Sequence, residues 1–413
     1  MNRTADSTAD TTAESAVDST AGTATAAPAG TASDTAPETG TPALRQSALA
    51  GEHADLGATF TDFGGWSMPL KYTSELTEHQ AVREAAGLFD LSHMGEVRVL
   101  GSQAGQFLNT ALVGNLARIS VGAAKYSMLC APDGGIIDDV ITYRVDEQEY
   151  LLVPNAANRE AVVEALTERA AGFEVEVWDE SEAISMVAVQ GPASEEIISS
   201  VVRANETFVV EGLKYYASAT VTIGGDEILL ARTGYTGEDG FELYAPNEKI
   251  GALWRALLSG GEEFGLIPCG LACRDSLRME AGMPLYGQEL SRSRTTFEAG
   301  IPVVAFSKEE DFVGREALEA AKAEGLGRTS GPRLVGLRGL GRRAARSGYR
   351  VDVDGVAAGV VPSGQPSPTL GYPIAMAYLD VAHTDPGTTV EVDVRGRPQP
   401  FEVVELPFYR RQE

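Results

Sequence analysis

The chain has 413 residues, of which 43% are hydrophobic and 22% are charged. This length is enough for two or three domains, and the composition excludes a wholly disordered or coiled-coil chain. With 33 Lys and Arg against 59 Asp and Glu, the formal net charge is −26, which argues against binding to nucleic acid or to an anionic lipid surface.

Cysteine content and hydropathy bear on the compartment. Three cysteines cannot form a disulfide framework, which indicates a reducing environment. No apolar run reaches the roughly 20 residues of a membrane-spanning helix, and the N-terminus lacks the basic start and apolar core of a secretory signal. We therefore expect a cytoplasmic protein.

Residues 1–43 differ in composition from the rest of the chain. They are mainly Ala, Thr, Ser, Asp, Gly and Pro, without any aromatic residue. Such a segment cannot bury enough apolar surface to offset the entropy of ordering. We predict a disordered tail; a partner-binding arm is disfavoured because there is no amphipathic period or hydrophobic anchor.

The globular texture begins near Phe60. A helix is predicted over 74–86, where Thr77 and Gln80 have the spacing of a capping box and Gly87 would end the helix. The alternation over 96–100 then predicts a strand.

The same order of helix and strand follows twice more. Asn158 can cap a helix from Arg159 to Ala171, and alternation over 173–177 predicts a half-exposed strand after it. A third helix begins at Asn247, with one apolar stripe formed by Ile250, Leu253, Trp254 and Leu257. Strands with one polar face, mixed with separate helices, predict antiparallel α+β domains.

Helical patterns disappear beyond about Gly327. Five short strands separated by Gly and Pro turns are predicted there, at 334–337, 355–361, 374–379, 388–394 and 401–404. We expect a C-terminal β-barrel over 328–413. The region 44–327 would form two α+β domains that meet near residue 180, with a segment that returns to the first domain after about 265.

Metal-binding patterns are weak. Cys269 and Cys273 are three residues apart, and the histidines at 53, 79, 93 and 383 are scattered, so no metal site is predicted and buried thiols are favoured. His93 is a possible acid or base, although a single His in a turn is usually structural.

Two consecutive aspartates lie in a predicted strand. With a period of two, Asp139 shares a face with Ile137, Ile141 and Tyr143, and Asp138 lies on the opposite face. A carboxylate on an apolar face is costly unless it is paired or used, and its pKa moves towards the range useful for proton transfer. The alternative is that both aspartates solvate a strand end after the Gly134–Gly135 turn. The two interpretations are comparable, and Asp139 is the favoured functional residue.

A glycine-rich run follows at 232–242. Glycines spaced by three allow close approach of the backbone to a ligand, and Glu242 shares a face with Tyr244. A carboxylate beside an aromatic ring suits a flat heterocycle with N–H donors. An ordinary glycine-rich hairpin is the alternative.

Several motifs occur in a fixed order: Phe63-Gly64-Gly65-Trp66, the run 88–96, Gly134-Gly135-Ile136-Ile137-Asp138-Asp139, the run 233–242, the runs 273–282 and 285–288, and Ser367-Pro368-Thr369-Leu370-Gly371. Together they resemble the aminomethyltransferase, or T protein, of the glycine cleavage system, from about residue 45 to about 411. Each motif alone is weak, and the ordered series is specific.

The resemblance implies a three-domain cloverleaf around a tetrahydrofolate site. It implies transfer of a one-carbon unit from an aminomethyl group, carried on the dihydrolipoyl arm of the H protein, to tetrahydrofolate, with release of ammonia. By position, Asp139 matches the catalytic aspartate. The residues that match the folate pocket are Met94, Tyr126, Tyr143, Asn155, Tyr235, Glu242 and Arg274. Neither a metal nor a redox cofactor is needed for this reaction.

Two alternatives stay open. One is a relative that takes one-carbon units from N-methylglycines, which is disfavoured because there is no room for a flavin-binding region. The other is a folate-binding scaffold or repair protein of the same fold without transfer activity. Asp139 and the segment 286–288 argue against this second alternative.

Seven arginines and no acidic residue lie between Arg328 and Arg350. Such a run is usually a solvated face. In so acidic a protein, it is also a candidate landing site for an anionic folate tail or an acidic partner.

Overall fold

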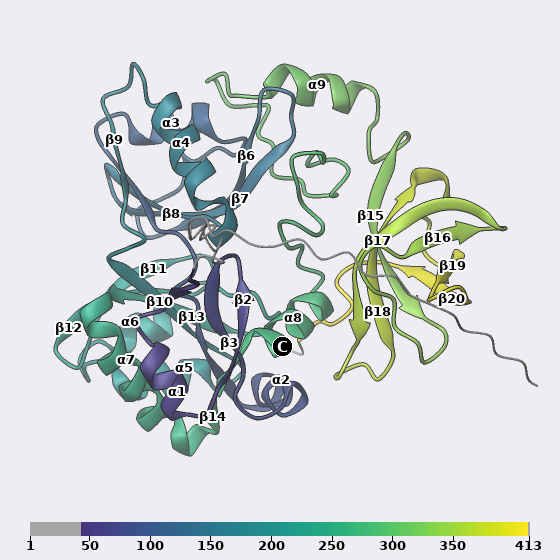
Figure 1. Ribbon diagram of the computed structural model, residues 1–413. Coiled ribbons are helices and arrows are strands. Elements are labelled where there is room, and N and C mark those ends of the chain that lie inside the picture. Colours follow the sequence, from purple (N-terminus) through teal and green to yellow (C-terminus); the bar gives the residue numbers. More distant parts are fainter. Residues whose placement is uncertain (1–42, 412–413) are drawn as a thin grey trace, which may run out of the picture. The chain divides into compact units, whose positions relative to one another are not determined.

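The computed structural model describes residues 43–411, so the tail predicted over 1–43 lies, apart from its last residue, outside the described residues. From Leu44 onwards the chain forms one compact unit of α+β architecture that ends in a closed barrel (Figure 1). Within residues 43–411, no helix has the length and apolar character needed to cross a bilayer.

The largest sheet has six strands. In spatial order they are β11 (Ser218–Ile223), β12 (Asp226–Ala231), β13 (Gly240–Pro246), β10 (Ile184–Gln190), β4 (Ala86–Asp90) and β14 (Leu266–Cys269). All neighbouring pairs are antiparallel except β4 and β14, which run parallel. The expected antiparallel α+β architecture is confirmed, and the one parallel pair of this sheet arises because β14 comes from a distant segment of the chain.

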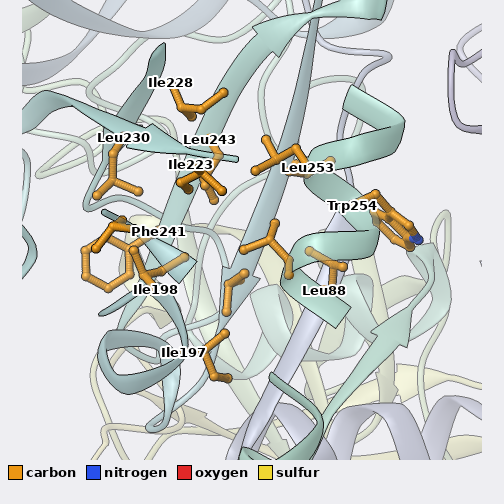
Figure 2. Close-up of a cluster of buried hydrophobic side chains, with 14 of the residues drawn as sticks. Leu88, Ile197, Ile198, Ile223, Ile228, Leu230, Phe241, Leu243, Leu253 and Trp254 are labelled. Atoms are coloured by element: carbon orange, nitrogen blue, oxygen red, sulfur yellow. The ribbon is translucent and has the colours of Figure 1, made fainter. Parts of the chain in front are cut away.

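Helices cover one face of this sheet. They are α1 (Ala50–Asp55), α5 (Ser194–Val201), α6 (Thr207–Gly212) and α7 (Asn247–Gly261), the last followed by the short 3-10 helix η2 (Glu262–Phe264). Figure 2 shows Ile198 of α5 beside Phe241 of β13, in the buried cluster that also contains Leu253 and Trp254 of α7. Burying each such side chain stabilises the fold by about 1.5–3 kcal/mol, which fixes which face of β13 points inwards.

The predicted apolar stripe of the third helix is confirmed. Ile250, Leu253, Trp254 and Leu257 of α7 are all buried in this cluster. Their i, i+3, i+4, i+7 spacing places them on one side of the helix, and this side packs against the sheet.

The second sheet has five antiparallel strands, in the order β6 (Ala124–Cys130), β7 (Ile136–Asp146), β8 (Glu149–Val153), β5 (Val97–Leu100) and β9 (Glu176–Asp179). Helices α3 (Ala104–Ala111) and α4 (Arg159–Arg169) pack on one face. The short 3-10 helix η1 (Ala156–Asn158) leads into α4. The other face of β7, with Ile141 and Tyr143, packs against residues of β10 and β13 in the six-stranded sheet.

One predicted helix end and one predicted capping bond need correction. Helix α2 (Glu75–Glu84) is capped by Ser74, whose hydroxyl accepts a hydrogen bond from the Thr77 amide, and it ends before Gly87, which belongs to strand β4. Asn158 does occupy the N-cap position of α4, but its side chain makes no capping bond there. The spacing of residues along the chain alone does not determine where the helix ends or which hydrogen bond a capping side chain forms.

A small sheet and the return segment connect these layers. The small sheet contains β1 (Arg45–Gln46), β3 (Trp66–Lys71) and β2 (Thr59–Phe63). Helix α8 (Leu271–Glu280) packs beside α2 and contacts the barrel strands β17 and β18. Helix α9 (Arg315–Ala323) packs through Leu318 against the end of the five-stranded sheet.

The C-terminal barrel is confirmed. Its six strands close in the order β15 (Pro332–Gly339), β18 (Pro373–Asp380), β17 (Val356–Pro366), β16 (Arg350–Val353), β19 (Thr389–Asp393) and β20 (Pro398–Val404), with a 3-10 turn η3 (Val381–His383) after β18. All pairings are antiparallel. Closure leaves no unpaired sheet edge, which suits strands this short.

Candidate active site

A cavity of about 300 Å³ lies where the two large sheets face each other. Its walls come from strands of both sheets, from α8 and from loops after β4 and after α8. This volume is at the lower end of the range for small-molecule sites, and the lining mixes aromatic and aliphatic side chains with a few polar groups, as such sites usually do.

The structure brings most of the predicted site residues to this cavity. Its lining contains Met94, Tyr126, Asp139, Asn155, Tyr235, Glu242 and Arg274. Tyr143 is different: it is fully buried one layer behind the wall, and its hydroxyl contacts Thr233 (2.8 Å) and Glu242 (3.1 Å). Tyr143 therefore positions a wall residue and does not itself form the wall.

The two aspartates of β7 point to opposite sides, as the period of two predicts. Asp138 is fully buried against the start of α4, where it accepts hydrogen bonds from the side chain and backbone of Asn155 and from the side chain of Asn158 (2.6 Å). Asp139 is half-buried and lines the cavity. The fully shielded carboxylate is thus Asp138, because the helix-covered side of the sheet is more tightly closed than the cavity side.

Asp139 is held by two neutral donors. The Tyr126 hydroxyl donates to Oδ2 (2.9 Å), and the Asn155 amide donates to Oδ1 (2.9 Å). Burial raises the pKa of Asp139, and the two hydrogen bonds partly oppose that rise. The pKa of Asp138 is raised too, by burial and by the neighbouring charge of Asp139. A carboxyl group with a raised pKa in a cavity is suited to proton transfer near neutral pH.

Glu242 presents one of its oxygens to the cavity. The hydroxyls of Thr233 (2.6 Å) and Tyr143 (3.1 Å) both donate to Oε2. Among the described residues, no hydrogen bond ends on Oε1. This arrangement fixes the carboxylate while leaving an acceptor for a ligand N–H group.

An aromatic and cationic pair closes another part of the wall. The Arg274 guanidinium, from α8, lies over the Tyr235 ring at 4.8 Å from the ring centre. The Tyr235 hydroxyl donates to the backbone oxygen of Pro284 (2.5 Å), which fixes the ring. A fixed flat surface of this kind can stack a planar heterocycle.

Two glycines of the run 232–242 leave room for a neighbouring side chain, and one of them, Gly234, also lines the cavity. A side chain at Gly234 or Gly240 would collide with the side chain of Gln190, with contacts of 2.0 and 2.3 Å. Gln190 in turn donates to the Thr233 backbone oxygen and accepts from Thr236. The small residues therefore make room for a buried glutamine that braces the loop, and that braced loop carries Thr233 and Tyr235 to the cavity.

One cluster has the residue types of a metal site. Ligand atoms of Glu78, Cys269 and Cys273 lie within 4.8 Å of one another. However, both carboxylate oxygens of Glu78 already accept backbone N–H groups, from Tyr72 and Thr73 on one oxygen and from Gly270 on the other. These bonds give the cluster a structural role in joining α2 to the start of α8.

Other lining residues escaped the sequence prediction. Phe63, His93, Thr233 and Leu285 lie in the motifs but had no assigned place in the pocket, and Tyr216 reaches it from a segment without a site pattern. Tyr216 has a positive φ of 61°, which is unusual for a non-glycine residue and marks a constrained position. Only the tertiary arrangement places these segments around one space.

Comparison with known proteins agrees with this architecture. The family model described as the GCVT N-terminal domain matches residues 49–308, and the glycine cleavage T-protein C-terminal barrel domain matches residues 333–410. The chain is 58% identical to the aminomethyltransferase of Streptomyces coelicolor over 372 residues, which cover 89% of this chain and 98% of that protein.

Similar proteins extend across other bacteria and to a solved structure. The aminomethyltransferase of Corynebacterium aurimucosum is 54% identical, over 88% of this chain and 98% of its own length. The crystal structure of glycine cleavage system aminomethyltransferase T from Bartonella henselae matches with a TM-score of 0.81 and 34% identity, over 89% of this chain and 98% of that one. The chain belongs to the glycine cleavage T-protein family.

Proposed function

We propose that the protein is an aminomethyltransferase of glycine cleavage. It takes the one-carbon unit of an aminomethyl group from the dihydrolipoyl arm of H protein and transfers it to tetrahydrofolate. The products are ammonia, 5,10-methylenetetrahydrofolate and the reduced arm. The observation that carries this proposal is the position of Asp139, held by Tyr126 and Asn155 in the wall of the cavity, in a chain of this family.

Bond changes in this reaction define what the site must supply. The C–N and C–S bonds of the aminomethyl thioether break, and two bonds from the carbon to the folate nitrogens N5 and N10 form. Two protons leave those nitrogens; one ends on ammonia and the other on the sulfur. The site must therefore accept and return protons and stabilise the cationic carbon that develops between the bonds.

Asp139 meets both requirements. Its negative charge favours the developing cation, and its raised pKa brings the carboxyl group closer to the range in which it can accept a folate proton and give it up again. The Tyr126 and Asn155 bonds hold the carboxylate in one orientation, which lowers the entropic cost of reaching a reactive geometry.

The remaining polar groups would bind the folate. The free Oε1 of Glu242 would accept N–H groups of the pterin ring, and the Tyr235–Arg274 surface would stack against a flat part of the folate. Met94 and Asn155 would complete the contact surface, and Tyr143 would act by holding Glu242 in place.

The deciding experiment mixes the purified protein with tetrahydrofolate and lipoylated, aminomethyl-loaded H protein, and follows ammonia. We expect ammonia release that requires all three components. Folate binding without ammonia release would contradict the proposal and would favour a folate-binding scaffold of the same fold. A reaction that proceeds without folate would also contradict it.

A further inference from the structure

The buried histidines of the protein differ in whether their ring nitrogens form hydrogen bonds. His53, His79 and His93 are each at most 3% exposed. In His53, Nε2 contacts Asp90 (2.8 Å) and Nδ1 contacts the Tyr72 hydroxyl (2.9 Å). In His79, Nδ1 contacts Ser276 (2.7 Å) and Nε2 contacts Thr369 (2.8 Å). Both rings are thus fully bonded inside the protein and have structural roles.

His93 lacks such partners. Neither ring nitrogen of His93 forms a hydrogen bond among residues 43–411, and only Nδ1 is shielded from water. Among these three histidines, only His93 lines the cavity. Because Nδ1 is shielded, Nε2 is the ring nitrogen that a ligand in the cavity can reach.

The backbone around His93 is held in place. The Ser92 amide donates to Asp90 Oδ1 (2.9 Å), the Met94 amide donates to the Leu91 oxygen, and the Gly95 amide donates to the Pro154 oxygen. The ring itself packs edge-on against Phe63, with 5.2 Å between the ring centres. The imidazole is therefore presented to the cavity by a rigid turn, as a group that acts on a bound substrate must be.

We infer that His93 is a second proton-transferring group of the reaction, which accepts one folate N–H proton at Nε2 and delivers it to the departing sulfur of the lipoyl arm. This inference rests on the proposed function. Two protons must leave the folate nitrogens, and Asp139 has one carboxyl group with which to carry one of them to ammonia. Asp139 could carry the two protons only in turn, whereas His93, which shares the cavity with Asp139, can carry the second proton to the sulfur.

The direction of this transfer follows from the surroundings of the ring. Burial and the nearby Arg274 charge lower the pKa of His93, and Asp90 opposes them. His93 is therefore neutral near pH 7 and able to accept a proton. Once protonated, it is a stronger acid than a thiol, whose pKa is about 8.5, so the proton passes on to the thiolate.

His93→Ala tests the chemistry. We expect kcat for ammonia release to fall by about 100-fold or more, with the KM for tetrahydrofolate changed by less than about threefold. Free imidazole in the buffer should restore much of the lost rate, because it can enter the vacated space and carry the proton. Imidazole should not restore Asp139→Asn. His383→Ala, on the barrel, is the matched control and should react like the wild type.

His93→Gln separates proton transfer from simple hydrogen bonding. The amide keeps a hydrogen-bonding group near the Nε2 position but cannot carry a proton. We expect normal folate affinity with a kcat as low as that of His93→Ala. A kcat for either variant within threefold of the wild type, or no rescue by imidazole, would overturn the inference.

A measurement on the wild-type protein avoids any folding defect of the variants. With ¹⁵N-labelled histidine, saturation with tetrahydrofolate should shift the Nε2 resonance of His93 and leave those of His53 and His79 unchanged. An unshifted His93 resonance at saturation would refute the contact. If the wild type itself releases no ammonia, the proposed function fails; if it does and the His93 variants match it, only this inference fails.

Discussion

Two buried polar regions of the molecule have opposite characters. Between α2, α8 and the barrel, Glu280 is fully buried and accepts hydrogen bonds from Ser367 (2.5 Å) and from the amide (3.0 Å) and hydroxyl (2.7 Å) of Thr369. Arg83 and His79 add ion pairs to the same carboxylate. In the cavity, by contrast, Glu242 has a free oxygen and His93 a free nitrogen. The comparison separates polar groups that stabilise the fold from polar groups that are available to bind a ligand.

The same contrast explains two of the sequence motifs. The run Ser367-Pro368-Thr369 lies in the loop between β17 and β18, and its two hydroxyl groups donate hydrogen bonds to the carboxylate of Glu280. Its role is to join the barrel to α8, which also carries Arg274 to the cavity. A motif shared with a family can therefore be structural even when it supports the site.

Asp139→Asn should produce the largest effect on the cavity side. An amide of the same shape cannot accept the folate proton or offset the developing positive charge, so ammonia release should fall by about 10³-fold, with folate binding retained. Single-turnover ammonia release and folate fluorescence titration check this. Asp146→Asn, at the exposed end of the same strand, is the control. Normal turnover by Asp139→Asn would end the assigned role.

Glu280→Gln should produce the largest effect on the structural side. It removes the buried charge that pairs with Arg83 and His79, which should lower the free energy of unfolding by about 3 kcal/mol. Urea denaturation measures this loss. Glu319→Gln, which breaks an exposed pair with Arg315, should cost about 0.5 kcal/mol or less. Equal losses for the two variants would remove the distinction between the regions.

Acid unfolding should sharpen the same point. Hydrogen bonds and ion pairing with His79, together with the Ser367 and Thr369 bonds, outweigh burial and lower the pKa of Glu280 from 4.5 to about 2. Because the folded pKa is below the unfolded one, this contribution is fully present above about pH 4.5 and is lost as the pH falls towards 2. Wild type should therefore lose more stability than Glu280→Gln between these pH values. Parallel pH profiles would contradict this assignment.

Glu242→Ala should weaken folate binding more than it slows the chemical step. Removal of a buried acceptor for ligand N–H groups should cost about 2 kcal/mol, or roughly 30-fold in the dissociation constant. Isothermal titration with tetrahydrofolate measures it, and Glu227→Ala, on the exposed surface of β12, is the control. Unchanged affinity would show that Glu242 belongs with the structural charges.

The arginine-rich segment of the barrel should give the smallest effect. Arg338 pairs with Glu402 and Arg350 with Asp352, whereas Arg342 and Arg343 are exposed and have no ion pair within residues 43–411. Reversal of both charges should change the KM for H protein or for polyglutamylated folate by about three- to tenfold, more at low salt than at high salt. If neither KM changes, this segment is only a solvated face.

The sequence by itself determined the periodic features of the protein. The stripe on α7, the alternation in β7 that separates Asp138 from Asp139, and the short barrel strands all follow from local spacing, because helix and strand geometry repeats every few residues. The ordered motifs indicated the family and predicted that Asp139 belongs to the site.

Only the tertiary structure decided which side chains form hydrogen bonds or contacts with each other. Asn158 could cap α4 or bond to Asp138, and the packing of α4 on β7 selects Asp138. The glycines of the run 232–242 could face a ligand or a neighbour: Gln190 of β10 occupies the space beside Gly234 and Gly240, and Gly234 also lines the cavity. Whether His93 is structural or functional depended on whether its ring nitrogens find partners from distant segments. These interactions join residues far apart in the chain, so the local periodicity of the sequence does not predict them.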